Sequence, residues 1–428
     1  MQRVIPTLRA TCLVIAIITT LMANADDWPQ FRGMNRDAVW NETGIMQTFP
    51  PEGLAVRWRA AAGGGFSSPV VAQGRVYLAD SALQKPKAQE RVRCWDEKTG
   101  QILWTHLYDV SYPDNAFNPP QGPGSTPIVE AGKLFALGIT GHLHCLDAVK
   151  GEVLWKRNLT ADYGLAEFSG TTPSPLIEGD LIILVIGGKP SACVVALDKN
   201  TGNEVWRALD DKWTYSSPIV ISAGGQRQLI VWTPDAVTSL NPVNGKTWWR
   251  EELNTPGTLA TVPTPVLKGD LLLFSGLMFQ LDPAKPAASA LWPESKNGTK
   301  RILSQTSIPL ILGDHVFSGK MPGKLVCLEA RTGNQVWETD KVTVKSSGSI
   351  IHLTPNGHSV LIFTDEGNLI RARLTPKGYE ELSRVHVINP TCAFGGRKVV
   401  WPPPAYANQH IFARNEEELI CASLAAKP

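Results

Sequence analysis

Two histidines, His142 and His144, are separated by one residue, the spacing that places both side chains on one face of a β-strand. A pair of imidazoles can begin a metal site, but a complete site needs three or four ligands. No Asp, Glu or Cys stands at ligand spacing to complete the shell. We therefore expect no metal at this position.

Other residues with chemical potential are also isolated in the sequence. The pair Asp210-Asp211 and the run Glu416-Glu417-Glu418 could supply an acid and a base, but nothing in their surroundings indicates burial. We interpret both as solvated turns. The runs Gly63-Gly64-Gly65 and Gly395-Gly396 do not precede a helical pattern, so they are interpreted as loops and not as phosphate-binding turns. The sequence thus predicts no catalytic residue.

An eleven-residue segment recurs along the chain. The first copy occupies residues 94–104 and reads CWDEKTGQILW, with an acidic residue third, Gly seventh and Trp last. Asp or Asn at the third position can bond its own backbone and open a tight turn, and Gly accepts the positive φ that such turns require. The segment predicts a β-hairpin whose closing Trp packs on a neighbouring unit. The further copies are residues 145–155, 196–206, 239–249 and 327–337.

A second phrase precedes each turn and consists of small polar residues, Pro, an apolar run, a Gly turn and another apolar run. Its Ser67-Ser68-Pro69 copy recurs as Ser125-Thr126-Pro127 and Ser216-Ser217-Pro218. Each unit therefore carries four short strands, at a period of about 43 to 51 residues between closing tryptophans, which is the range of propeller blades. Because the serine pairs recur with the repeat, we expect a structural role beside a central channel and not a nucleophile.

The docking positions give the number of blades. Two units are degenerate: the fifth reaches its Trp ten residues after Asp282 through a Pro- and Ala-rich loop, and the seventh ends in Leu382. The last unit has only three strands before the chain ends, whereas residues 55–58 form an unmatched strand near the other end. We predict an all-β, eight-bladed propeller of four-stranded antiparallel blades over residues 55–428, closed by this amino-terminal strand in the last blade. The docking positions are Trp58, Trp104, Trp155, Trp206, Trp249, Trp292, Trp337 and Leu382.

The amino terminus has the features of a secretory signal. Arg3 and Arg9 precede a short apolar stretch at residues 11–21, and Ala23-Asn24-Ala25 forms a small-x-small cleavage site. The apolar stretch is shorter than the roughly 20 residues that span a bilayer, and no later segment qualifies. We predict cleavage after Ala25, a periplasmic or secreted mature chain, and a segment at residues 26–54 that packs on the propeller.

The cysteine positions predict the state of the thiols, and the charge balance disfavours one class of partner. Six cysteines remain after residue 25, and the four that share one repeat position are held apart around the ring, so we expect small buried hydrophobes. Cys392 stays undecided. Lys and Arg number 41 against 39 Asp and Glu, which offers no basic excess for nucleic acid. Trp401 lies in a Pro-rich loop outside the docking register, where a surface environment is expected.

With these residues in view, the chain resembles the pyrroloquinoline-quinone (PQQ) repeat β-propeller family, whose mark is Ala-x-Asp-x-x-Thr-Gly-x-x-x-Trp. The match covers about residues 55–424. The nearest members look like BamB-type outer-membrane assembly factors and related exported proteins that begin, as here, with DWPQFRG at residues 27–33. This resemblance implies a non-catalytic, monomeric interaction module of the cell envelope with envelope proteins as partners. BamB proteins are commonly lipoproteins, and this chain has no lipobox around Cys12.

Two alternatives stay open from the resemblance. One is a quinoprotein dehydrogenase, which would bind PQQ with calcium, and the other is a carbohydrate-binding propeller. In the dehydrogenases the quinone lies between a Trp and a disulfide of adjacent cysteines, and no Cys-Cys pair occurs in this sequence. We therefore expect no cofactor and no enzymatic activity.

Overall fold

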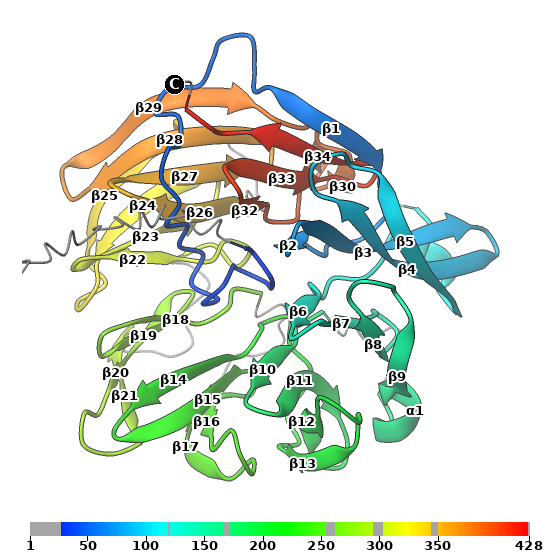
Figure 1. The fold of residues 1–428 in the computed structure, drawn as a ribbon. Helices are drawn as coiled ribbons and strands as arrows, with labels where there is room; N and C mark the ends of the chain where they lie inside the picture. Colours follow the sequence, from blue (N-terminus) through cyan, green and yellow to red (C-terminus); the bar gives the residue numbers. More distant parts are fainter. Residues whose placement is uncertain are drawn as a thin grey trace, which may run out of the picture.

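The computed structural model describes residues 27–118, 120–165, 172–253, 262–293, 303–343 and 350–426. Eight four-stranded antiparallel sheets surround a central channel as the blades of a β-propeller (Figure 1). The predicted fold class is thereby confirmed. The predicted signal sequence and its cleavage site lie outside the described residues.

Within each of the first seven blades the strands follow chain order from the inside of the ring to the rim. The first four blades consist of β2 (Val70–Ala72), β3 (Arg75–Gln84), β4 (Lys87–Asp96) and β5 (Ile102–Val110); β6 (Ile128–Glu130), β7 (Lys133–Leu137), β8 (His142–Asp147) and β9 (Val153–Asn158); β10 (Leu176–Glu178), β11 (Leu181–Gly188), β12 (Ala192–Asp198) and β13 (Glu204–Ala208); β14 (Ile219–Ala223), β15 (Gln226–Trp232), β16 (Ala236–Leu240) and β17 (Thr247–Glu252).

The second half of the ring repeats this pattern, and the eighth blade takes its rim strand from the start of the chain. These blades consist of β18 (Val266–Lys268), β19 (Leu271–Phe274), β20 (Leu277–Leu281) and β21 (Ala288–Trp292); β22 (Leu310–Leu312), β23 (His315–Lys320), β24 (Lys324–Glu329) and β25 (Gln335–Thr339); β26 (Ile351–Asn356), β27 (Ser359–Thr364), β28 (Asn368–Thr375) and β29 (Gly378–His386); β32 (Ala405–Ala407), β33 (His410–Arg414), β34 (Glu418–Ser423) and β1 (Val56–Ala61).

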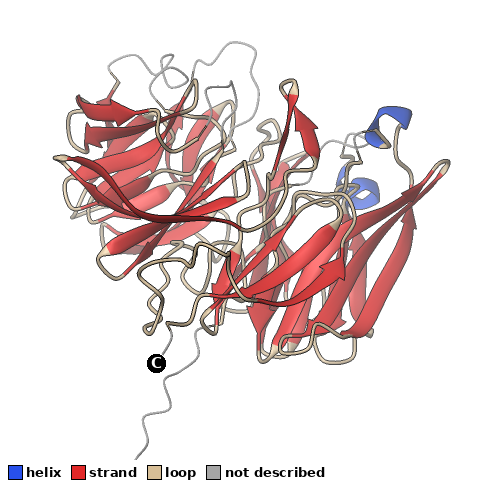
Figure 2. Cartoon of the chain, turned by 90° about the horizontal axis from the view of Figure 1, so that it is seen from above, coloured by secondary structure: helices blue, strands red, loops and turns tan. Residues whose placement is uncertain are grey.

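Few elements lie outside the blades. Strands dominate the view from above, and the helices are short (Figure 2): the 3-10 helix η1 (Asp114–Ala116) and the α-helix α1 (Leu159–Tyr163). A two-stranded hairpin, β30 (Cys392–Phe394) and β31 (Arg397–Val399), is inserted between the seventh and eighth blades.

The ring closes through pairing of residues far apart in the chain. Strand β1 runs antiparallel to β34, with Trp58 opposite Cys421, more than 360 residues away in sequence. The eighth blade thus reaches four strands, and the strand that the sequence left unmatched closes it as predicted. Strand β1 covers the outer edge of β34 and becomes the rim strand of this blade.

The hydrophobic core is divided into clusters that lie between neighbouring blades. In β11, Leu184 packs in a cluster with the second blade, whereas the next residue, Val185, packs in a cluster with the fourth. Successive side chains of a strand point to opposite faces, so a blade strand with both faces buried must be apolar throughout. Each blade therefore depends on its two neighbours for burial.

We expect Trp58→Ala to lower the free energy of unfolding by about 3 to 5 kcal/mol, the range for a buried aromatic truncated to Ala. Trp58 is buried and its ring packs against Phe412 of the eighth blade at 6.1 Å between centroids. Equilibrium denaturation measures the change, and Trp104→Ala should lower the free energy of unfolding by a similar amount.

Trp401 is not the surface residue that its Pro-rich surroundings suggested. It is half-buried, with the rings of Phe394 and Phe66 at 4.8 and 5.9 Å. A better control is Trp213, which is 38% exposed and should lose less than about 1 kcal/mol on truncation. If Trp58→Ala proves as mild as Trp213→Ala, the closing strand does not stabilise the ring.

Candidate functional site

The docking tryptophans join successive blades. In six of them the indole Nε1 donates a hydrogen bond to a backbone carbonyl in the turn between the last two strands of the following blade. The indole ring packs between the two blades, and its N–H group is hydrogen-bonded there. The six bonds are Trp58 to Glu97 (2.7 Å), Trp104 to Ala148 (3.2 Å), Trp155 to Lys199 (3.2 Å), Trp206 to Pro242 (3.1 Å), Trp292 to Ala330 (2.8 Å) and Trp337 to Thr375 (2.8 Å).

The turn glycine is required at five of these six seams for two reasons; at the Trp337 seam, nothing lies within 4 Å of a Cβ placed on Gly378. Gly100 has φ +69°, and a Cβ placed on it would lie 2.6 Å from the Trp58 ring. Gly151 repeats this geometry with φ +74° and a 2.5 Å approach to Trp104. A larger residue would both strain the backbone and displace the indole. The same contact recurs at Gly202, Gly245 and Gly333.

The repeat cysteines lie opposite the docking tryptophans. Cys94 pairs across the sheet with Trp104, and Cys145 pairs in the same way with Trp155; Cys327 and Cys421 face Trp337 and Trp58. All six cysteines of the described chain, Cys392 included, are buried and free. Burial raises the pKa of the Cys94 thiol to about 12, so these side chains pack as small apolar groups, as predicted.

The fourth seam departs from this pattern. Trp249 donates instead to Gln228 Oε1 of its own blade, at 2.8 Å, and the turn that follows Asp282 contains no glycine. The β14–β15 turn takes over the contact: a Cβ on Gly224 would lie 2.1 Å from the Lys285 carbonyl. A cleft of about 490 Å³ opens beside Gly224 and Asp282.

The recurring serines and threonines form a belt around the channel. The Ser68 N–H donates to Thr126 Oγ1 at 3.1 Å, and the Thr126 N–H donates to Ser174 Oγ at 3.0 Å. The Ser174 N–H donates in turn to Ser217 Oγ at 2.9 Å. The hydroxyls therefore link inner strands of successive blades, which is the structural role that their recurrence predicts.

The segment before β1, the dark blue trace of Figure 1, lies against the inner strands of several blades. Trp28 forms an antiparallel bridge with Val71 of β2, through N–H to O distances of 2.8 and 2.9 Å. The Pro29 carbonyl accepts from β6, and the Trp40 N–H donates to β26. Trp28 and Trp40 both contact the Tyr406 ring. The segment thus forms backbone hydrogen bonds with the edges of inner strands.

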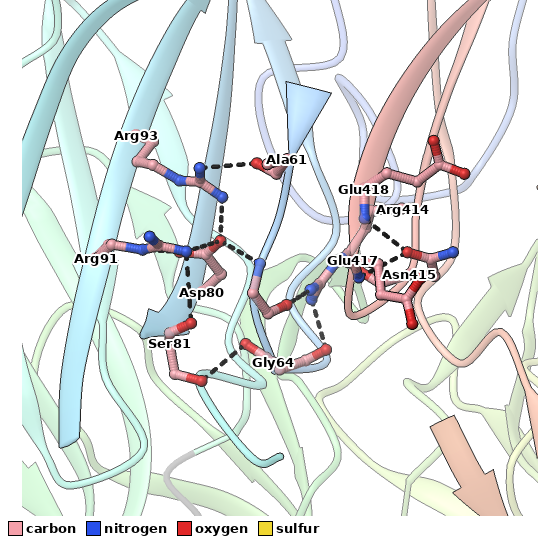
Figure 3. Close-up of polar contacts among 12 residues, drawn as sticks. Ala61, Gly64, Asp80, Ser81, Arg91, Arg93, Arg414, Asn415, Glu417 and Glu418 are labelled. Atoms are coloured by element: carbon pink, nitrogen blue, oxygen red, sulfur yellow. Dashed lines mark hydrogen bonds and ion pairs between the residues drawn. The ribbon is translucent and has the colours of Figure 1, made fainter. Parts of the chain in front are cut away.

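A buried cluster of charges holds the junction of the eighth and first blades (Figure 3). The fully buried Asp80 carboxylate forms ion pairs with Arg91, at 2.8 Å, and with Arg93. It also accepts from the first N–H of the 63–65 loop, at 2.8 Å, while Arg414 of β33 donates to carbonyls of the same loop. The loop is therefore fixed by side chains from both ends of the ring.

The paired histidines are packing groups at the seam of the first two blades. His142 and His144 lie side by side on β8, with centroids 6.4 Å apart, and His106 of β5 contacts His144 edge-on at 4.7 Å. Burial lowers the pKa of His144 to about 3, and the nearby His106 contributes. In the part of the chain that the structure describes, no group of His, Cys, Asp or Glu is arranged to hold a metal ion.

Sequence reasoning missed Glu90, a fully buried carboxyl group at the same seam. It accepts hydrogen bonds from the Tyr108 and Tyr112 hydroxyls, at 2.6 and 2.8 Å, and from the Ile139 N–H at 3.1 Å. Burial raises its pKa, although these bonds favour the ionised form. A closed network of this kind ties the loop after β5 to the second blade. A single Glu in a strand gives no sequence signal of such a role.

The interpretation of Asp211 as part of a solvated turn is wrong. Its carboxylate is buried and pairs with Arg250 at 2.9 Å, while also accepting from the Thr233 hydroxyl at 2.7 Å. Only Asp210 of the pair lies at the surface, where it accepts from the Ser191 N–H. Within the acidic run at 416–418, Glu418 pairs with the exposed Arg59 at 2.7 Å. These carboxylates stabilise turns and strands.

Exposed apolar side chains occur on several rim strands, among them Val205 of β13 and Val336 of β25, and are most numerous on β5. Strand β5 presents Ile102, Leu103 and Leu107, each about half exposed, and the neighbouring β9 presents Val153 and Leu154. Both are rim strands of their blades. Apolar side chains grouped beside a sheet edge are typical of a surface that contacts another protein.

These features define a class of protein: an eight-bladed β-propeller of the PQQ-repeat type, whose blades dock through tryptophan and glycine. A family model described as outer membrane protein assembly factor BamB matches residues 88–278 and 280–375. The chain belongs to this family. In the described part of the chain no helix is long and apolar enough to cross a membrane.

Known relatives agree with this assignment. BamB of Shewanella oneidensis is 24% identical over 351 residues, which cover 78% of this chain and 71% of the relative. BamB of Salmonella typhimurium is 25% identical over 181 residues, or 41% and 40% of the two chains.

Solved structures share the fold. The crystal structure of BamB from Moraxella catarrhalis has a TM-score of 0.55 at 16% identity, over 86% of this chain and 99% of that one. Quinohemoprotein alcohol dehydrogenase from Comamonas testosteroni has a TM-score of 0.62 at 14% identity, over 94% and 81%. At these identities the likeness extends to the propeller alone.

A pair of glycine substitutions separates docking from backbone strain. Gly100→Ala and Gly74→Ala both place a side chain at φ near +70°, at a cost of about 1 to 2 kcal/mol. Only Gly100→Ala also drives a Cβ into the Trp58 ring, whereas nothing lies within 4 Å of the Gly74 position. We expect Gly100→Ala to destabilise by a further 1 to 3 kcal/mol, the order of magnitude for overpacking. Equal denaturation midpoints for the two variants would contradict the docking role.

Proposed function

We propose that this protein is a non-catalytic interaction module of the cell envelope that acts in the assembly of outer-membrane proteins. The observation that carries the proposal is the family match, which extends over most of the propeller. The similarity to BamB of Shewanella oneidensis over 78% of this chain supports it. The mature protein would work in the periplasm as a monomer, after cleavage behind Ala25, with envelope proteins as its partners.

The rim of the first two blades is the surface we assign to a protein partner. Three apolar side chains on β5 and two on β9 face solvent there, while the docking residues beneath them are committed to the fold. Strand β5 is nine residues long and lies at the edge of its sheet. An extended edge with apolar side chains offers both main-chain hydrogen bonds and apolar contacts to a partner segment.

The non-catalytic part of the proposal is supported by the burial and the bonded partners of the reactive groups. Glu90 and the histidines of the first seam are held in packed contacts, and the cysteines are buried thiols with raised pKa. Asp211 and Asp80 are each committed to ion pairs. A general acid or nucleophile must reach a substrate, and these groups are enclosed by protein.

Leu107→Lys on β5 should weaken capture of an envelope partner by about tenfold or more, because a charge at the centre of an apolar contact is left desolvated. The assay is affinity capture from envelope extracts, with mass spectrometry to identify outer-membrane assembly proteins. Val243→Lys is the control variant, because Val243 is also an exposed apolar residue but lies on the fourth blade. Equal capture by the two variants would exclude the β5 rim as the contact.

No PQQ-dependent dehydrogenase activity is expected, because the sequence contains no pair of adjacent cysteines to form the disulfide platform. Dye reduction with alcohols and aldoses is measured with PQQ and calcium added to the full chain. Turnover that rises with PQQ and disappears with a chelator would overturn the non-catalytic assignment.

A further inference from the structure

Strand β5 contacts the second blade through three ring-bearing side chains at alternate positions, Trp104, His106 and Tyr108. Alternate residues of a strand share one face. Trp104 bonds the Ala148 carbonyl at one end of this face. The centroids of the His106 and Tyr108 rings lie 4.7 and 4.3 Å from that of His144 on β8. The first seam, between the first two blades, is therefore joined by imidazole rings from both sides.

Basic groups are concentrated at this seam. His142 lies beside His144 on β8, with ring centroids 6.4 Å apart. Lys156 of β9 pairs directly opposite His144 across the sheet, and residues opposite each other in an antiparallel pair project on the same side. A lysine side chain is a cation. A proton taken up by any of the three histidines would thus add a positive charge to a place that already has one.

Two ring nitrogens at the seam have no hydrogen-bond partner. His144 Nδ1 and His106 Nε2 are both buried, and neither atom forms a hydrogen bond. A neutral imidazole has one N–H group and one lone pair, whereas an imidazolium has two N–H groups. The charged form of either ring would therefore place an N–H group where no acceptor lies, and a buried donor without an acceptor is costly. The closed seam favours neutral histidines.

The acidic groups near the seam are bonded to other donors. The Glu90 carboxyl group accepts from Tyr108, Tyr112 and the Ile139 N–H, and the exposed Asp109 of β5 accepts from the Gln89 side chain. Burial raises the pKa of Glu90. This group therefore takes up a proton more readily when the seam is closed, so it opposes opening as the pH falls.

The histidines act in the opposite direction. Burial lowers the pKa of all three, that of His144 to about 3, and the charge of Lys156 adds to the effect on each. A histidine that is exposed by opening has a pKa of about 6.5. Above that pH neither state takes up a proton, and the seam keeps its full stability. Below it the open state binds protons that the closed state excludes, so the seam loses stability as the pH falls.

We propose that the first seam is a pH-sensitive switch, in which mild acidification protonates the histidines and releases β5 from the second blade. Histidine is the side chain whose charge ordinarily changes between about pH 5 and pH 8. All three rings lie at one seam, so their protonation acts on one contact and favours a local opening. Strand β5 also carries the rim assigned to a partner, but the switch rests on the contacts of the seam and not on the proposed function.

Hydrogen exchange of the full chain at pH 7.5 and pH 5.5, corrected for intrinsic exchange rates and resolved by mass spectrometry, tests the proposal. At pH 5.5 each histidine that is protonated only when exposed raises the opening equilibrium about tenfold. We expect the corrected exchange of residues 102–110 to rise at least about tenfold, and that of β29, a rim strand of the same length, to rise less than about threefold. No rise in β5, or an equal rise in both strands, overturns the proposal.

His144→Phe keeps an aromatic ring that cannot take up a proton, and it should make the rise in β5 about tenfold smaller than in wild type. His358→Phe is the matched control, because His358 is exposed in the turn between β26 and β27, and it should leave the rise unchanged. His106→Phe provides a second variant in case His144→Phe does not fold. A rise equal to that of wild type in whichever seam variant folds would show that these histidines serve packing alone.

Discussion

The contact between a docking tryptophan and the turn glycine of the next blade is the interaction on which the rest of this structure depends. A four-stranded blade cannot bury both of its faces alone, so each blade needs its neighbours. The indole spans the seam and bonds the backbone of the next turn, and the glycine makes room for it. Where the next turn lacks a suitable glycine, as after Asp282, Trp249 turns back to its own blade and a cleft opens.

Because every blade is stabilised by the next, the ring has to close, and closure uses residues from opposite ends of the chain. Trp58 docks on the first blade as the other tryptophans do on theirs, but it belongs to a strand paired with the chain's last strand. The Asp80 and Arg414 cluster then fixes the loop that leads from one end of the ring into the other. In the seventh blade the docking register is occupied by Ser383, opposite Arg371, and not by Leu382 as predicted, and the eighth blade has no turn between its last two strands to receive an indole.

The repeating part of the fold could be predicted from the sequence, because the turn glycine and the docking tryptophan recur many times along the chain. Gly100 and Trp104 are informative since their relatives stand in register along the chain. Asp211, Glu90 and Arg36 occur once each, and their roles depend on partners that only the closed ring brings near. The Arg250 that pairs with Asp211, for example, stands 39 residues later, on another strand. No local sequence pattern predicts such a pair.

In a propeller of this kind, function is to be sought where the repeat is broken. The docking residues are equivalent from blade to blade and therefore cannot distinguish one surface from another. Distinct surfaces arise from the long β5 edge with its apolar side chains, from the fourth seam, and from the segment before β1. This segment contributes no blade strand, yet it adopts a strained backbone to bury Arg32 and Arg36. Arg36 donates to the carbonyls of Pro175 and Pro218 at the starts of two inner strands, so side-chain hydrogen bonds as well as backbone pairing tie the segment to the third and fourth blades.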